Sequence, residues 1–349
     1  MNVRRALAVS AAALIALTTA ACGSDEPEQP ASTASGASAE SLLIYSGRNE
    51  TLVKPILDRL EQQTGVDVEV RYGGSSELAA QLLEEGEGTQ ADLFFSQDAG
   101  ALGALAKAGR LETLPEGTSA KVQQRFVDPN GRWVATSARA RVIAYDPEQA
   151  PEVTDMSSID AVLDPKYKGK VAFAPTNASF QSFVTALRVS KGEDGATQWL
   201  ERFKANDPQA YDNNNLVLDA VDSGQVALGL LNHYYWYERV AEKGADAVSA
   251  KIHFLDADDP GALINVAGAG ILAGSPQKAA AAKAVDFLLS EEGQRYFADE
   301  TAEYPVVEGI TTTEHDLVPL ADVQGSSVDL NSLDSLDETL ALLDEVGLT

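Results

Sequence analysis

Apolar and polar positions along the chain repeat a short strand followed by a helix. Leu42-Leu43-Ile44-Tyr45 is an apolar run typical of a buried strand. The segment 51–63 then carries apolar residues at helical spacing and stops before Gly65, a residue that commonly ends helices. The pattern therefore predicts a strand at 42–45 and a helix at 51–63.

The same rhythm returns twice in the next fifty residues. The segments 66–70 and 91–95 have the patterns of strands, and each precedes a helix. Ser75 or Ser76 is expected to cap the first of these helices, and Asp98 opens the second. Three strand–helix units in succession predict an α/β lobe with a mostly parallel sheet.

A second lobe is predicted between two longer strands. Residues 139–145 form a strand that carries the chain out of the first lobe, and the glycine-bearing strand 262–272 returns it. The segments between and beyond them follow the strand and helix patterns. Strands are predicted at 170–174 and 225–231, and helices at 179–189, 195–203, 276–289, 291–297 and 333–346. A further helix is predicted to follow the three asparagines at 213–215 and to end at Val221. Two lobes joined by two strands describe a hinged clamp that closes on a small solute.

These patterns divide the chain into five parts. The predicted boundaries are a signal segment at 1–21, a tether at 22–40, a discontinuous first lobe at 41–141 plus 266–330, a second lobe at 142–265, and a C-terminal helix at 331–349.

Two adjacent tyrosines stand out at a predicted strand-to-helix corner. Tyr234 and Tyr235 follow the apolar strand 225–231, and helical character continues to Gly244. Open α/β sheets place ligand crevices at the carboxyl ends of their strands. Phenolate oxygen is a hard donor suited to hard cations. The pair therefore indicates either a metal site or buried aromatics with a polar tip.

Composition excludes one class of partner. Apolar residues make up 44% and charged residues 23%, ordinary values for a folded protein, but the net charge is −27. Nucleic acid requires a basic surface, so it is not an expected partner.

The amino terminus has the features of a targeting segment. Arg4 and Arg5 precede an apolar stretch that is too short and alanine-rich to span a membrane convincingly. Cys22, the one cysteine of the chain, follows small residues and resembles the lipidated cysteine of a bacterial lipobox; an ordinary cleaved signal is the alternative. Residues 23–40, rich in Ser, Ala, Pro and acids, have the composition of a flexible tether. The expected location is extracytoplasmic, lipid-anchored to the bacterial cell membrane.

Several motifs, taken in order, resemble a known family. They are Tyr45-Ser46-Gly47, the segments 61–66, 91–94 and 164–170, Asn232 to Tyr237, Asp259-Pro260-Gly261-Ala262 and Ala302-Glu303-Tyr304-Pro305. The chain resembles the periplasmic ferric iron-binding proteins, the solute-binding components of iron ABC importers. The resemblance implies a two-lobed periplasmic-binding-protein (type 2) fold with mostly parallel sheets and two hinge strands. It also implies a monomer that delivers its cargo to the permease and ATPase of an ABC importer.

The resemblance assigns Tyr234 and Tyr235 as phenolate ligands of Fe(III). Where many members have a histidine and a glutamate, this chain has Asn49 and Gln97, whose neutral amides are weaker ligands for a hard cation. Glu50 is a possible substitute, although a first-turn acid also suits a helix dipole. His233, beside the pair, is a further candidate for the metal or its surroundings.

With two phenolates, Fe(III) retains positive charge and open positions, so the resemblance implies a synergistic phosphate or carbonate. The matching residues are Asn177, Ala178, Ser179, Asn214, Asn232 and Arg139. The first three precede a predicted helix, whose free N–H groups favour an oxyanion; simple helix capping is the alternative. Arg139 could instead form a structural ion pair. Phe180 stands where some relatives have a third tyrosine.

The predicted function is an extracytoplasmic receptor that binds Fe(III) for import. The alternative is a solute-binding lipoprotein for a metal-free oxyanion, a phosphonate or a small organic solute. An enzyme is not expected, because the chain has no nucleophile elbow, no zinc-binding helix motif and no phosphate-loop signature.

Overall fold

The computed structural model describes residues 41–312, 314–323 and 325–349. The predicted signal segment, Cys22 and the predicted tether lie outside these residues.

The described residues follow the predicted order of strands and helices. The strands are β1 (Ser41–Ser46), β2 (Asp67–Tyr72), β3 (Leu93–Ser96), β4 (Val134–Tyr145), β5 (Val171–Phe173), β6 (Gln209–Ala210), β7 (Leu228–Asn232), β8 (Lys251–His253) and β9 (Ile264–Ile271). The helices are α1 (Glu50–Thr64), α2 (Ser75–Glu85), α3 (Ala99–Lys107), α4 (Ala178–Ala205), α5 (Asn214–Asp222), α6 (His233–Lys243), α7 (Lys278–Leu288), α8 (Glu291–Asp299) and α9 (Leu336–Val346).

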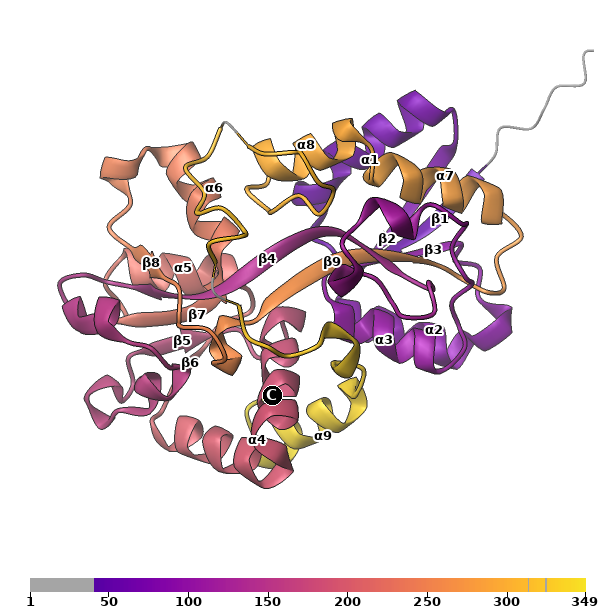
Figure 1. Cartoon of the computed structure of the whole chain (residues 1–349). Helices are drawn as coiled ribbons and strands as arrows, with labels where there is room; N and C mark the ends of the chain where they lie inside the picture. Colours follow the sequence, from indigo (N-terminus) through magenta and orange to yellow (C-terminus); the bar gives the residue numbers. More distant parts are fainter. Residues whose placement is uncertain (1–40, 313, 324) are drawn as a thin grey trace, which may run out of the picture. The chain divides into compact units, whose positions relative to one another are not determined.

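The strands pair in the order β2-β1-β3-β9-β4-β7-β5-β6, with β8 on β4 (Figure 1). Within the first lobe β1 lies parallel to β2 and β3, and within the second β5 lies parallel to β6 and β7. The pairs that include β4 or β9 are antiparallel. Parallel pairing inside each lobe follows from the strand–helix rhythm, because a helical crossover returns the chain in the same direction.

The two long strands connect the lobes as predicted. From Val134 to Ala140 β4 pairs with β9, and from Arg141 to Tyr145 it pairs with β7. One strand therefore belongs to the first lobe at its start and to the second at its end. The predicted lobe boundaries at 141/142 and 265/266 fall within β4 and β9.

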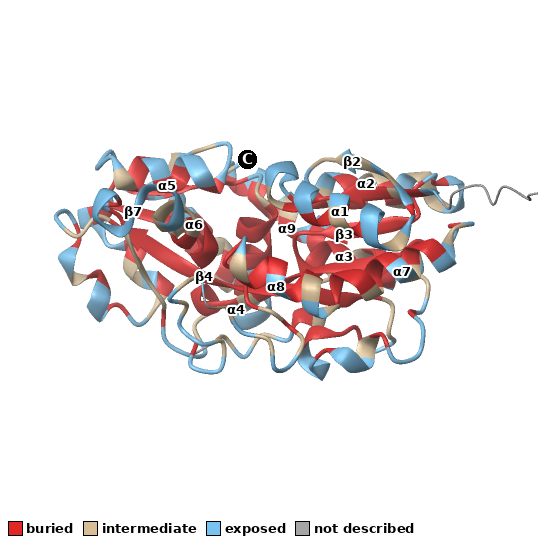
Figure 2. Ribbon diagram, turned by 90° about the horizontal axis from the view of Figure 1, so that it is seen from above, coloured by how far each residue is buried: buried red, intermediate tan, exposed pale blue. Residues whose placement is uncertain are grey.

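Each lobe has its own apolar core. One buried cluster joins β1, β3 and β9 to α1, α2, α3 and α7, and two further clusters surround β5 and β7. Figure 2 shows β3, β4 and β7 buried, while α1, α2, α5 and α7 turn exposed faces outward. Helices on a central sheet are the arrangement that the amphipathic pattern predicts.

Helix ends agree with the sequence in most places. Asp98 caps α3 through the Ala101 N–H, and Gly65 ends α1 in the left-handed conformation. The two helices predicted at 179–189 and 195–203 are the halves of α4, separated at Gly192, where φ is 73°. The predicted capping of α2 by Ser75 or Ser76 is wrong. Gly74 occupies that position without a side-chain cap, because the Ser75 hydroxyl accepts a hydrogen bond from the Gln97 N–H instead.

In the described part of the chain, no helix combines the length and apolar character needed to cross a membrane.

Close packing of α3 on β9 yields a first prediction. A Cβ at Gly268 would lie 2.7 Å from the Val134 carbonyl oxygen and 2.8 Å from Leu102 Cδ1. We expect Gly268→Ala to lower the free energy of unfolding by about 1–3 kcal/mol, since neither strand nor helix can yield freely. Urea denaturation measures this change. Gly88→Ala, which meets no atom within 4 Å, is the control; equal losses in both variants would contradict the packing argument.

Candidate functional site

A cavity of about 600 Å³ lies where the carboxyl ends of the parallel strands of both lobes meet. Its walls come from the loops after β1, β2 and β3 in the first lobe and after β5, β6 and β7 in the second. The lining includes Arg48, Asn49, Ser75, Ser76, Gln97, Asn177, Ala178, Gln181, Asn213, Asn215 and Tyr235. This is the position at which open α/β sheets bind ligands.

The tyrosine pair begins α6 directly after β7. Tyr235 lines the cavity, and Tyr234 lies against it with ring centroids 4.2 Å apart and the planes tilted by 30°. Tyr234 is 1% exposed and Tyr235 8%. The two phenols thus form one unit, in which Tyr235 faces the cavity and Tyr234 lies behind it.

Both phenols are protonated in the absence of a ligand. Burial raises the pKa of Tyr234 well above its ordinary value, and the neighbouring Tyr235 adds to this shift. Burial also raises the pKa of Tyr235, while its hydrogen bonds with Tyr234 and Asn214 oppose the rise. The charge of Arg48 favours the phenolate of each residue. The two phenols are therefore neutral, and they become phenolates only when a highly charged cation displaces their protons.

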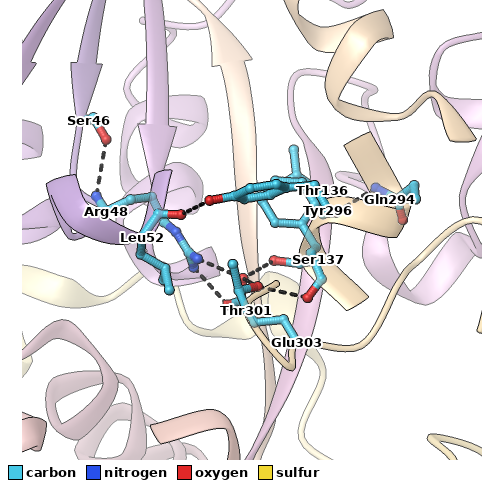
Figure 3. A network of polar contacts seen from close by, with 10 residues as sticks. Ser46, Arg48, Leu52, Thr136, Ser137, Gln294, Tyr296, Thr301 and Glu303 are labelled. Atoms are coloured by element: carbon cyan, nitrogen blue, oxygen red, sulfur yellow. Dashed lines mark hydrogen bonds and ion pairs between the residues drawn. The ribbon is translucent and has the colours of Figure 1, made fainter. Parts of the chain in front are cut away.

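Arg48 is held at the cavity by a buried ion pair. Its Nη1 donates to Glu303 Oε1 at 2.9 Å and its Nη2 to Glu303 Oε2 at 2.6 Å. Figure 3 shows Ser137 and Thr301 directed at the same carboxylate, and both hydroxyls donate to Oε2. Burial alone would raise the pKa of Glu303, but the Arg48 charge and these hydrogen bonds hold it below its usual value.

Two more arginines are buried on β4. Arg139 is fully buried, and none of its guanidinium nitrogens has a hydrogen-bond partner among the described residues. Burial lowers its pKa, while the nearby Tyr234 opposes that shift. The ion pair considered for Arg139 is thus not formed as a direct contact. Arg141 Nη1 donates to the Ser179 carbonyl oxygen at 2.8 Å, and burial lowers the pKa of Arg141 to about 9.

The structure brings Asn49 and Gln97 to the cavity, but it does not bring Glu50 there. Asn49 caps α1, and its Oδ1 accepts from both the Thr51 N–H and hydroxyl. Gln97 Nε2 donates across the cavity to Asn177 Oδ1 at 3.4 Å. Glu50 is an exposed first-turn residue of α1 on a separate groove beside β2.

His233 lies behind the tyrosine pair, and it does not line the cavity. Its ring stacks on Tyr304 at 4.5 Å and meets Tyr234 edge-on, and Nδ1 accepts from the Ala140 N–H. Burial lowers its pKa to about 4, so the ring is neutral. Asn232 ends β7 and precedes α6; it is 1% exposed, and its Nδ2 has no partner among the described residues.

Three of the six predicted anion residues, Asn177, Ala178 and Ser179, lie at the start of α4. Asn177 caps this helix, accepting from the Ser179 N–H at 3.0 Å and the Ser179 hydroxyl at 2.8 Å. Asn214 Nδ2 donates to Ser179 Oγ at 3.2 Å, so the starts of α4 and α5 are joined. Asn177 and Ala178 line the cavity, while Ser179 and Asn214 support it from behind. Asn177 therefore caps α4, as the alternative to anion binding predicted, and it also lines the cavity.

Sequence reasoning missed several residues of this region. Arg48 directly follows the Tyr45-Ser46-Gly47 motif, and Glu303 lies in the motif at 302–305, yet no local pattern indicates that they form an ion pair. Ser76 Oγ donates to Gln181 Oε1 at 2.5 Å, a second contact across the cavity. Glu238, one turn after Tyr234 on α6, has a pKa raised by burial to about 8. The sequence did offer a signal for Glu238: it lies four residues after Tyr234, and residues four apart share a helix face.

Comparisons with known proteins agree with this geometry. Residues 89–324 match the family model described as bacterial extracellular solute-binding protein. The major ferric iron-binding protein of Neisseria meningitidis serogroup A is 33% identical over 309 residues, covering 88% of this chain and 93% of the relative.

Solved structures show the same fold. Iron-bound HitA from Pseudomonas aeruginosa matches with a TM-score of 0.83 and 34% identity, over 88% of this chain and 99% of that one. A Trichodesmium protein, solved in complex with iron and citrate ligands, matches with a TM-score of 0.73 and 27% identity, over 88% and 100%. The predicted two-lobed type 2 fold is confirmed. The chain belongs to the bacterial extracellular solute-binding family, among the periplasmic ferric iron-binding proteins.

Proposed function

We propose that this protein binds Fe(III) between its lobes through the phenolate oxygens of Tyr234 and Tyr235. The observation that carries the proposal is the pair of contacting tyrosine rings, one phenol of which lines a cavity between the lobes. Phenolates are hard donors, and a trivalent cation is able to displace protons from phenols whose pKa is raised. The relatives named as ferric iron-binding proteins support the same cargo.

A synergistic oxyanion, phosphate or carbonate, completes the proposed site. Two phenolates neutralise two of the three charges of Fe(III), so one positive charge remains. Asn177 and Ala178 at the start of α4 face the cavity, where helix N–H groups and the dipole favour an anion. Arg139, buried without a hydrogen-bond partner among the described residues, adds a positive charge near Tyr234.

The proposed biological role is iron import. Cys22 carries the lipid anchor, residues 23–40 form the tether, and the clamp delivers Fe(III) to the permease and ATPase of an ABC importer. The protein performs no covalent chemistry on its cargo. The lobe boundaries predicted above remain part of this proposal, with closure around β4 and β9.

A colour measurement tests the iron site. Protein mixed with ferric salt and phosphate is expected to show a visible phenolate-to-iron charge-transfer band, and Tyr234→Phe is expected to abolish it. Tyr237→Phe is the matched control, because Tyr237 is a buried tyrosine of the same helix whose hydroxyl interacts with the Val318 backbone. A colourless wild-type protein would contradict the proposal. Phosphate titrations with and without iron separate it from metal-free binding, which iron would leave unchanged.

A further inference from the structure

The C-terminal segment takes the chain from the first lobe back to the second. Leu330 and Leu333 are buried in the first-lobe cluster, and the Leu333 carbonyl oxygen would lie 2.8 Å from a Cβ placed at Gly100 of α3. The chain then enters α9, which packs against α4 of the second lobe and also touches α3 (Figure 1). This segment therefore crosses between the lobes in addition to β4 and β9.

The buried face of α9 is divided between the two lobes. Leu336 belongs to the first-lobe cluster, and Leu340, four residues later, packs against the same cluster. Leu342 and Val346, on the adjacent side of the helix, belong to a cluster of the second lobe. Because residues three or four apart lie on one side of a helix, α9 carries two adjoining apolar stripes, one for each lobe.

Hydrogen bonds fasten α9 to the second lobe. Arg188 of α4 is 7% exposed, and its Nη1 donates to the Ser335 carbonyl oxygen and to Thr339 Oγ1, both at 2.8 Å. At the other end of α9, Lys204 Nζ donates to the Val346 carbonyl oxygen at 2.5 Å. Buried and satisfied hydrogen bonds fix one arrangement of the helices that they join. We therefore expect α9 to move with α4 when the lobes separate.

The contact of α9 with the first lobe is smaller. Leu336 is buried there, but Leu340 is only half-buried. The ion pair between Lys107 and Asp334, 3.1 Å long, leaves 64% of the lysine side chain exposed, and such surface pairs contribute little to stability. Of the two contacts that α9 makes, the one with the first lobe is thus the one that opening would break.

Leu340 connects this contact to the binding cavity. Its side chain lines the cavity together with Ser76 of the first lobe and Gln181 of the second. Ser76 Oγ donates to Gln181 Oε1 across the cavity, so the lobes are closed on each other at this place. Seating α9 on the first lobe and closing the cavity are therefore parts of one movement.

We propose that α9 is a latch, a helix that moves with the second lobe and holds the cavity closed by seating Leu336 and Leu340 on the first lobe. A ligand that binds only the closed form has an apparent Kd equal to its intrinsic Kd divided by the closed fraction. The latch raises that fraction and so tightens binding. Lobe closure can be measured without iron, and only the iron measurement below rests on the proposed function.

Two leucines of α9 give a matched test, since Leu336 is 6% exposed on the first-lobe side and Leu342 is 8% exposed on the second-lobe side. The full chain carries Cys22→Ser, so that no lipid is attached. Leu336→Ala is expected to enlarge the radius of gyration of the iron-free protein in small-angle X-ray scattering. It is also expected to speed iron release to a chelator by about tenfold or more. Leu342→Ala is expected to leave the radius of gyration unchanged and the release rate within about twofold.

Gly103→Ala keeps the test decisive if Leu336→Ala does not fold. A Cβ at Gly103 would lie 3.1 Å from Asp334 Cβ and would push Asp334 away from α3, while alanine favours the helix. This variant is expected to change both measurements in the same direction as Leu336→Ala. An unchanged radius of gyration in both variants, or an equal increase in Leu342→Ala, would overturn the latch. A wild-type protein that stays colourless with ferric salt while these scattering differences persist would overturn the iron site and leave the latch.

Discussion

Iron retention is expected to weaken by about 100-fold for each unit that the pH falls. Burial raises the pKa of Tyr234 and Tyr235, so both are protonated in the iron-free protein at neutral pH. Binding as phenolates releases two protons, and each contributes about 1.36 kcal/mol per pH unit. The sign follows directly: higher pH removes the competing protons and tightens binding, and acid releases the iron.

Competition with a chelator of known pH dependence measures this slope. The anion is chosen so that its own protonation does not change over the range. Tyr234→Phe, if it retains any iron, should show a slope of about one proton, or about tenfold per pH unit. Calorimetry in buffers of different ionisation enthalpy counts the released protons independently. A wild-type affinity that does not change with pH would exclude ionisation of the pair on binding.

Breaking the buried ion pair is expected to destabilise the fold by about 3–5 kcal/mol. Arg48 and Glu303 are both buried, and their bidentate contact also receives the Ser137 hydroxyl (Figure 3). Glu303→Gln keeps the shape but leaves the Arg48 charge buried without its counterion. Because the pKa of Glu303 is lowered in the folded protein, its stabilisation is present above the unfolded value and is lost as pH falls through the folded one.

Urea denaturation at neutral pH measures the loss, with Glu300→Gln as the matched control. Glu300 pairs with Arg59 at the surface, where both side chains are more than a third exposed, so its removal should cost less than about 1 kcal/mol. Arg48→Met combined with Glu303→Leu should recover part of the stability, because the Arg48 charge is removed together with its counterion. Similar losses for Glu303→Gln and Glu300→Gln would contradict this account.

Local pattern was sufficient for the elements and for several of their ends. The apolar spacing of 51–63 matches α1, and Asp98 and Gly65 cap helices as their residue types predict. Ser75 shows where such reasoning fails. A serine before a helix favours a cap, but its hydroxyl is engaged by Gln97, twenty-two residues away and after a different strand. Tertiary contacts outweigh a local preference that is worth only about 0.5–2 kcal/mol.

By itself, the sequence determined the α/β class, the two connecting strands and the position of the tyrosine pair at the carboxyl end of a strand. These features depend on spacing and on neighbours in the chain, which the sequence displays directly. The tertiary structure alone decided that Tyr235 faces the cavity with Tyr234 behind it, that Glu50 is directed elsewhere, and that Arg48 meets Glu303. Those outcomes depend on which loops the sheet order brings together, and residues 255 positions apart have no local signal of their contact.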